Sequence, residues 1–210
     1  VTRGSARNYF DSTGVTQAAG NNTGGFGHNN ASLASLGLMI EEQRVFRMLW
    51  NRDWTNAAYD TVTNVTAAKN ATGLDGVANS ASTLTADAGN AVISQTITLA
   101  SAARVYSVWI KRVTGTGNIE LSDDGGSNWT DVKSSLNSST FTQVFVTRTQ
   151  ANPDVGIRIV TSGDVIEVDG GAVEEGTIPS LVPEFTTTDA VTRATDNVTM
   201  SDVTWMNQTQ

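Results

Sequence analysis

The chain has 210 residues, of which 39% are hydrophobic and 16% are charged, and it carries a formal net charge of -8 with a pI near 4.5. This length is sufficient for a sizeable core, and the acidic balance argues against DNA or another polyanion as the main partner. The chain has no cysteine, which excludes disulfides and thiolate metal sites. No apolar run approaches the roughly 18 residues that a membrane span needs, so we expect no membrane partner. Because of the acidic balance, we also expect no nucleic-acid partner.

Residues 1–35 are rich in glycine and asparagine and show no sustained hydrophobic periodicity. Such a segment buries too little apolar surface to fold by itself. We therefore predict an extended N-terminal arm that lies along the β domain or along a neighbouring subunit. His28, the only histidine of the chain, lies in this arm with no serine or carboxylate constellation around it in the sequence. A histidine-based triad or a zinc site is therefore not expected.

Residues 36–60 connect the arm to the rest of the chain, and their second apolar run ends in two tryptophans, Trp50 and Trp54. From residue 61 onward, short alternating runs separated by Gly, Asn or Asp turns predict strands. Strands at intervals of about ten residues are typical of a two-sheet β-sandwich, and eight of them fit a jelly roll. The predicted strands are residues 61–69, 82–86, 91–99, 104–113, 117–121, 141–148, 155–160 and 164–173.

We therefore predict an all-β chain in three parts. The extended arm occupies residues 1–35, and the jelly-roll β-sandwich occupies residues 36–185. Residues 186–210 are expected to form a C-terminal extension or linker.

Residues 122–129 read SDDGGSNW and match the Asp-box pattern Ser-x-Asp-x-Gly-x-x-Trp, which is found in sialidases and other secreted β proteins. In such a hairpin turn Asp124 accepts hydrogen bonds from turn amides, Gly126 supplies a positive φ, and Trp129 packs back over the turn. The box is structural in those families and remote from their active sites. We therefore predict a stapled hairpin rather than a catalytic element.

Several further short motifs are spaced along nearly the whole chain. They are YFDSTGV at residues 9–15, GLMIEE at 37–42, the looser RMLW at 47–50 and WTN at 54–56, VEEG at 173–176 with two prolines after it, and AVTRA at 190–194. Together they resemble a pattern of phage and prophage virion-surface proteins, tail fibres and tail-associated proteins especially. The resemblance implies a jelly-roll module similar to carbohydrate-binding modules, a location on the virion surface, contacts with other virion subunits and, because virion fibres are usually symmetric, a homotrimer.

The aromatic residues carry the argument for glycan binding, because sugars stack their apolar C–H faces on Trp and Tyr while their hydroxyls bond to polar side chains. The candidates are Trp54, Tyr59, Trp109 and Trp129, and the ligand that the resemblance implies is a host-surface polysaccharide. The alternative for each of them is a place in the core. Trp54 and Tyr59, which border the polar segment 51–56, are expected to form the exposed platform.

Asp169 departs from the virion-surface pattern, which has Val-Trp-Gly-Ala where this chain has VDGGA at residues 168–172. An aspartate buried in the last predicted strand needs an arginine, turn amides or a cation as its partner. Jelly-roll binding modules often hold a structural calcium, and Asp169 with a second carboxylate and backbone carbonyls would suit that ion. The alternative is a salt bridge.

The sequence does not indicate an enzyme. Its acidic pairs, at residues 41–42, 123–124 and 174–175, consist of adjacent residues, which point to opposite faces of a strand and so cannot act as two facing carboxylates. Two functions remain open: a non-catalytic virion-surface module that binds host glycans, or a purely structural virion or decoration protein that mediates subunit assembly. A third, a glycosidase accessory domain, would require a catalytic domain beyond Gln210. An exposed aromatic platform favours the first, and an arm buried between subunits favours the second.

Overall fold

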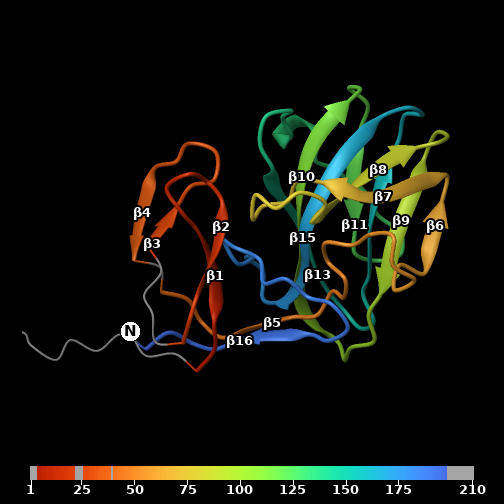
Figure 1. Cartoon of the computed structure of the whole chain (residues 1–210). Coiled ribbons are helices and arrows are strands. Elements are labelled where there is room, and N and C mark those ends of the chain that lie inside the picture. The colour runs from red at the N-terminus through yellow and green to blue at the C-terminus, as the bar shows by residue number, and fades with distance from the viewer. Residues whose placement is uncertain (1–3, 22–25, 39, 198–210) are drawn as a thin grey trace, which may run out of the picture.

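The structure is a computed structural model that describes residues 4–21, 26–38 and 40–197, and its regular secondary structure is β-strand apart from one short 3-10 helix, η1 (Lys133–Ser135). Two five-stranded antiparallel sheets pack face to face (Figure 1). The first sheet has the order β13-β10-β15-β8-β7, and the second has the order β12-β11-β14-β9-β6. Their bounds are β6 Thr61–Thr63, β7 Val65–Ala71, β8 Ala81–Ala86, β9 Ala91–Thr96, β10 Ala102–Thr114, β11 Ile119–Ser122, β12 Thr130–Asp131, β13 Thr142–Gln150, β14 Asp154–Ile159 and β15 Val165–Glu175.

The order of these strands defines the fold. In the first sheet β8, β15, β10 and β13 are successive neighbours, and in the second β9, β14, β11 and β12 are successive neighbours. This is the strand order of a jelly roll. The predicted jelly-roll β-sandwich is therefore confirmed, with β7 and β6 each adding one outer strand. Among the described residues no helix is long and apolar enough to cross a membrane.

The alternation of β10 shows how one strand serves both faces of the first sheet. Tyr106, Val108 and Ile110 are buried in the core between the two sheets, together with aliphatic side chains of the second sheet. Trp109 lies on the opposite face, in a second apolar cluster. The pattern read from the sequence therefore places the strand correctly and also predicts that it has two different faces.

The predicted strand at residues 61–69 is in fact two strands, β6 and β7, which lie in different sheets. Asn64 between them has a φ of 56°, in the left-handed region that asparagine tolerates better than most residues. That residue turns the chain from one sheet to the other. Strand β12 was not predicted, because its two residues are too few to show a period.

Residues 1–35 were predicted to form an extended arm, and the structure corrects this. The described residues form two hairpins, β1 (Arg7–Phe10) with β2 (Thr16–Ala19) and β3 (Phe26–His28) with β4 (Ser35–Leu38). These four strands make a small N-terminal lobe beside the sandwich (Figure 1). The predicted boundary at residues 35 and 36 falls inside β4, because the arm's glycines and asparagines shape hairpin turns rather than an extended chain.

The second apolar cluster holds this lobe against the outer face of the first sheet. Phe10 of β1 contacts Trp109 of β10 edge to face, with ring centroids 5.2 Å apart. The backbone N–H of Thr16 also donates to the carbonyl of Leu74, at 2.7 Å. The other members of the cluster are Ala71, Ala81, Phe141 and Val182, with Tyr9 and Phe185 half-buried against them. The lobe is thus packed on the sandwich of its own chain.

The segment after residue 185, predicted as an extension or linker, is also packed where the structure describes it. Strand β16 (Val191–Arg193) pairs with β5 (Arg44–Phe46). Arg193 lies 3.3 Å from Glu41, and Arg7 of the lobe lies 2.6 Å from Asp196. Burial raises the pKa of Glu41, while Arg193 and Arg7 oppose that rise. Residues 198–210 of the predicted extension lie outside the described residues.

Candidate functional site

Trp54 and Tyr59 were expected to form an exposed platform, and that expectation is wrong. They are only 1% and 4% exposed and stack on each other in the main core, with ring centroids 4.6 Å apart. The polar segment 51–56 suggested a solvent-exposed loop, but its first residue, Asn51, faces inward. Asn51 is fully buried and donates from its amide nitrogen to the carbonyls of Gly171 and Glu184. In a sequence, a polar side chain that forms hydrogen bonds with buried backbone groups cannot be distinguished from one in a solvent-exposed loop.

Trp129 lies in the Asp-box turn, whose predicted geometry is confirmed. Asp124 accepts hydrogen bonds from the backbone N–H of Asn128 at 2.9 Å and from its side-chain amide at 2.7 Å. Gly126 has a φ of 80°, and a Cβ there would lie 2.9 Å from Cζ2 of Trp129. The guanidinium of Arg158 lies over the indole, 4.6 Å from the ring centroid. Trp129 is therefore half-buried against its own turn and contributes to the staple.

Asp169 is the carboxylate for which calcium and a salt bridge were the alternatives, and the structure has the salt bridge. Arg52 donates to both carboxylate oxygens, at 2.9 and 3.1 Å, and the backbone N–H groups of Leu74 and Gly170 donate at 2.8 and 2.9 Å. Burial raises the pKa of Asp169, and these four donors oppose that rise. The described part of the chain contains no group of three His, Cys, Asp or Glu residues that could hold a metal ion.

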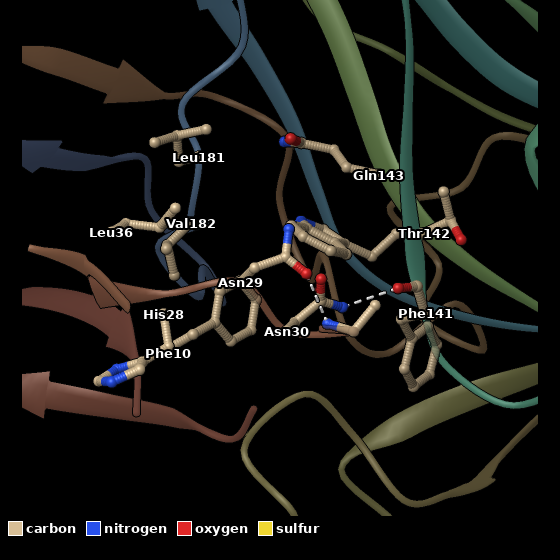
Figure 2. Close-up of a pocket in the computed structure, with 12 residues that line it drawn as sticks. Phe10, His28, Asn29, Asn30, Leu36, Phe141, Thr142, Gln143, Leu181 and Val182 are labelled. Atoms are coloured by element: carbon tan, nitrogen blue, oxygen red, sulfur yellow. Dashed lines mark hydrogen bonds between the residues drawn. The ribbon is translucent and has the colours of Figure 1, made fainter. Parts of the chain in front are cut away.

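Trp109, the remaining aromatic candidate, lies at the groove that is the candidate binding site. It lines a groove of about 320 Å³ between the tip of the β3–β4 hairpin and the outer face of the first sheet. Figure 2 shows the hairpin residues on one side of this groove and those of β13 on the other. The lining residues are Phe10, His28, Asn29, Asn30, Ala31, Leu36, Trp109, Phe141, Thr142, Gln143, Leu181 and Val182.

Hydrogen bonds hold the walls of the groove in position. The side-chain amide of Asn30 donates to the carbonyl of Phe141 at 2.8 Å, which ties the hairpin tip to the sandwich (Figure 2). Asn29 accepts from two backbone N–H groups of the same turn, at 3.0 and 2.8 Å. On the far wall the amide of Gln143 donates to the carbonyl of Ser180 at 2.8 Å. Both walls are therefore set by the protein itself.

The chemistry of the groove is aromatic at its base and polar but uncharged at its walls. Trp109, Phe10 and Phe141 form the aromatic base, of which only the ring edges reach the groove, since the three residues are 5%, 3% and 8% exposed, and the asparagines, Thr142 and Gln143 supply amide and hydroxyl groups. Nε1 of Trp109 and Nδ1 of His28 are both buried and have no hydrogen-bond partner among the described residues. None of the lining residues carries a carboxylate. The groove therefore combines a narrow aromatic base with neutral hydrogen-bonding groups, and its lining contains no acid/base pair.

Of the four predicted aromatic residues, only Trp109 lies in this groove. Sequence reasoning missed the residues that surround it, because they come from three segments more than 30 residues apart. The arm's cluster of asparagines was noticed only as a matter of composition, although Asn29 and Asn30 form one wall. The remaining signal was the strand alternation, which puts Gln143 on the same face as its cross-strand neighbour Trp109.

No family model matches this sequence, and neither does any curated protein. Several solved structures are similar in fold. The C-terminal CBM6 of LamC, a marine laminarinase from Zobellia galactanivorans, is 8% identical with a TM-score of 0.41, over 64% of this chain and 100% of that one. The carbohydrate-binding module CBM6cm-2 of Cellvibrio mixtus lichenase 5A, in complex with cellotriose, is 11% identical with a TM-score of 0.39, over 66% and 99% of the two chains.

A further solved structure contains the CBM22-1 and GH10 modules of Clostridium thermocellum xylanase 10B, complexed with xylohexaose. It is 13% identical with a TM-score of 0.43, over 69% of this chain and 30% of that chain. At these identities and TM-scores, the likeness to the three structures extends to the fold alone.

Proposed function

We propose that this protein is a non-catalytic glycan-binding module and that the groove over Trp109 is its binding site. The observation that carries the proposal is the composition of the groove, an aromatic base with amide and hydroxyl groups on both walls. Sugars need both features, because their C–H faces stack on aromatic rings and their hydroxyls exchange hydrogen bonds with neutral polar groups. A neutral lining suits an uncharged polysaccharide better than an acidic one.

The proposal that the module is non-catalytic is supported by the same lining. Hydrolysis of a glycosidic bond generally requires two carboxylates that flank the bond. The described residues around the groove include none, and His28 is the only ionisable side chain among them. We expect incubation of the purified protein with a polysaccharide to release no reducing ends. Release of reducing ends would contradict the proposal directly.

We further propose that the module acts on a virion surface, as part of a tail fibre, tail-associated protein or head fibre. This part rests on the short motifs that resemble phage virion-surface proteins, such as GLMIEE and AVTRA. Its ligand would then be a host-surface polysaccharide, and its neighbours would be other virion subunits. A homotrimer is the assembly that this context favours.

The test is a binding screen of the whole chain against host-surface polysaccharides, followed by calorimetry on a matched pair of variants. Leu36→Asp places a charge on the rim of the groove. The control, Val113→Asp, places a charge on the sandwich outside the groove lining. The two positions are similarly exposed, Leu36 at 54% and Val113 at 48%. We expect Leu36→Asp to weaken binding at least tenfold, or about 1.4 kcal/mol, and Val113→Asp to leave it unchanged.

Trp109→Phe provides a second measurement at the base of the groove, because it keeps an aromatic ring and removes the indole N–H. We expect a several-fold loss of affinity with the fold retained, as checked by circular dichroism. Wild-type protein that binds no polysaccharide would overturn the proposal. So would a Leu36→Asp variant that binds as tightly as wild type.

The alternative function is a structural virion protein whose N-terminal lobe contacts neighbouring subunits. One observation favours it specifically: the β3–β4 hairpin exposes several large apolar side chains. The two functions are compatible, because some of the exposed apolar side chains of the hairpin, those of Phe26 and Leu38, lie outside the groove lining and could contact a neighbouring subunit while the groove binds a glycan.

A further inference from the structure

The β3–β4 hairpin carries an unusual amount of exposed apolar surface. Phe26 is 63% exposed, Leu36 54% and Leu38 37%, and Ile40, two residues after the end of β4, is 60% exposed. We call these four residues the hairpin face. Phe26 and Leu38 are directly opposite each other in the antiparallel pair, so their side chains lie on the same side of the hairpin. Single exposed apolar residues are ordinary, but a contiguous group of this kind marks a surface that another molecule covers.

The same region is free of charge. Residues 12–40 contain no Asp, Glu, Lys or Arg, although the chain as a whole has 34 of them and a net charge of -8. A second copy of an acidic chain is repelled wherever two acidic surfaces approach each other. It can approach closely at a surface without charge. The hairpin face is therefore suited to contact between copies of this chain.

The strands of the hairpin also lack the features that protect free edges. β3 and β4 form a two-stranded sheet with no further strand at either edge in the described part of the chain. Soluble monomers blunt such edges with Lys, Pro or inward-pointing charges, and the residues of these two strands include none of these. Figure 1 shows β4 at the outer side of the lobe, away from the sandwich. Two-stranded sheets are also marginal by themselves, which favours the addition of a strand.

We infer that the hairpin face is a self-association surface, on which a second copy of this chain packs its own hairpin face and adds a strand to β4. An apolar, uncharged strand edge is complementary to an identical edge. A nucleic acid or an anionic membrane would instead need a basic surface, and this segment has no lysine or arginine. Leu36 belongs to both the hairpin face and the groove, whereas Phe26 and Leu38 do not line the groove, so substitutions at these two residues test self-association separately from glycan binding.

The first test measures the mass of the whole chain by light scattering over a dilution series. Wild type should be a multiple of 22.2 kDa, and the double variant Phe26→Thr/Leu38→Thr should be a monomer of that mass. Threonine retains strand propensity while removing the apolar surface. The matched control is Val113→Thr/Phe145→Thr, which changes two similarly exposed side chains of the sandwich and should keep the wild-type mass. Wild type that is monomeric throughout, or a double variant with the wild-type mass, would overturn the inference.

A second measurement covers the case in which the double variant fails to fold. Because the chain has no cysteine, Leu38→Cys introduces a single thiol, and a short bis-maleimide should join two copies through it. Val113→Cys is the control at a similarly exposed site on the sandwich. We expect at least tenfold more cross-linked product from Leu38→Cys than from the control. Equal yields from the two variants would overturn the inference by themselves.

Discussion

The two apolar clusters of this protein are both well buried, yet they are assembled in different ways. The main core lies between the sheets and draws on one continuous region of the chain, from Met48 through successive strands to Val173 of β15. The second cluster lies outside the first sheet and joins Phe10, Trp109, Phe141 and Val182, which come from four separate segments. The first cluster makes the sandwich, whereas the second attaches the lobe and forms the base of the groove. The comparison indicates that the sandwich can be stable while the attachment of the lobe is lost.

The largest effect is expected where the main core is opened. Trp54→Ala removes a buried indole that stacks on Tyr59. The substitution should lower the free energy of unfolding by about 5 kcal/mol. Denaturant unfolding followed by circular dichroism measures this loss. The control is Phe145→Ala, an exposed residue of the sandwich, which should change stability by less than about 0.5 kcal/mol. A Trp54→Ala variant as stable as that control would contradict the burial.

The next effect concerns the ion pair between the two clusters. Asp169→Asn removes one of the two carboxylates paired with Arg52 and leaves the pair with Asp75, and it should cost about 3 kcal/mol because buried donors lose a charged acceptor. Glu167→Gln is the matched control, because it makes the same chemical change on the same strand at a more exposed pair with Lys111. It should cost less than about 1 kcal/mol. Equal losses from the two variants would show that burial does not distinguish the pairs.

A substitution that opens only the second cluster should separate the lobe from the sandwich. Phe10→Ala should weaken the attachment of the lobe by about 3 kcal/mol and leave the sandwich folded. Limited proteolysis with mass spectrometry should then cut the lobe first, and Trp109 fluorescence should shift to longer wavelength. Tyr9→Ala, at the half-buried neighbouring position, should have a smaller effect. A single transition in which lobe and sandwich unfold together would contradict the separation.

The smallest effect is a change in the acid sensitivity of stability. Burial alone would raise the pKa of Asp75, but hydrogen bonds from Arg52 and Ser80 hold it down to about 2, below the usual 3.8. A lowered folded-state pKa stabilises the protein above pH 4, and this contribution is lost as the pH falls toward 2. Asp75→Asn should therefore flatten the stability profile in that range. Ser80→Ala should flatten it less, because Arg52 remains, and identical profiles for wild type and Asp75→Asn would refute the assignment.

The short motifs that suggested a virion protein also acquire a physical role. Glu41 of GLMIEE and Arg193 of AVTRA are 152 residues apart in the sequence, and their charged groups lie 3.3 Å apart in the structure. Arg7 lies 3.6 Å from the same Glu41 carboxylate. The two motifs therefore meet in one ion-pair network that joins the lobe, β16 and the segment before β5. Their joint presence in a sequence predicts this junction rather than a binding site.

The strands and the Asp-box turn can be predicted from the sequence alone, because both depend on neighbours a few residues away. Alternation along β10 and β14 and the spacing of Ser122, Asp124, Gly126 and Trp129 are local, so a single sequence contains them completely. Only the tertiary structure decided which aromatic residues are buried. A polar residue such as Asn51 predicts a solvent-exposed position when only the sequence is known. In the structure Asn51 is buried, because its side-chain amide donates a hydrogen bond to the distant carbonyl of Gly171.

The same reason explains the lobe and the groove. Glycine and asparagine in residues 4–38 permit hairpins, yet hairpins this small become stable only against the outer face of a sheet whose residues lie about a hundred positions later. The contact of Phe10 with Trp109 and the bond from Asn30 to Phe141 have no local signature, because no residue near either partner reveals the other. Contacts between distant segments decided where this protein has its groove.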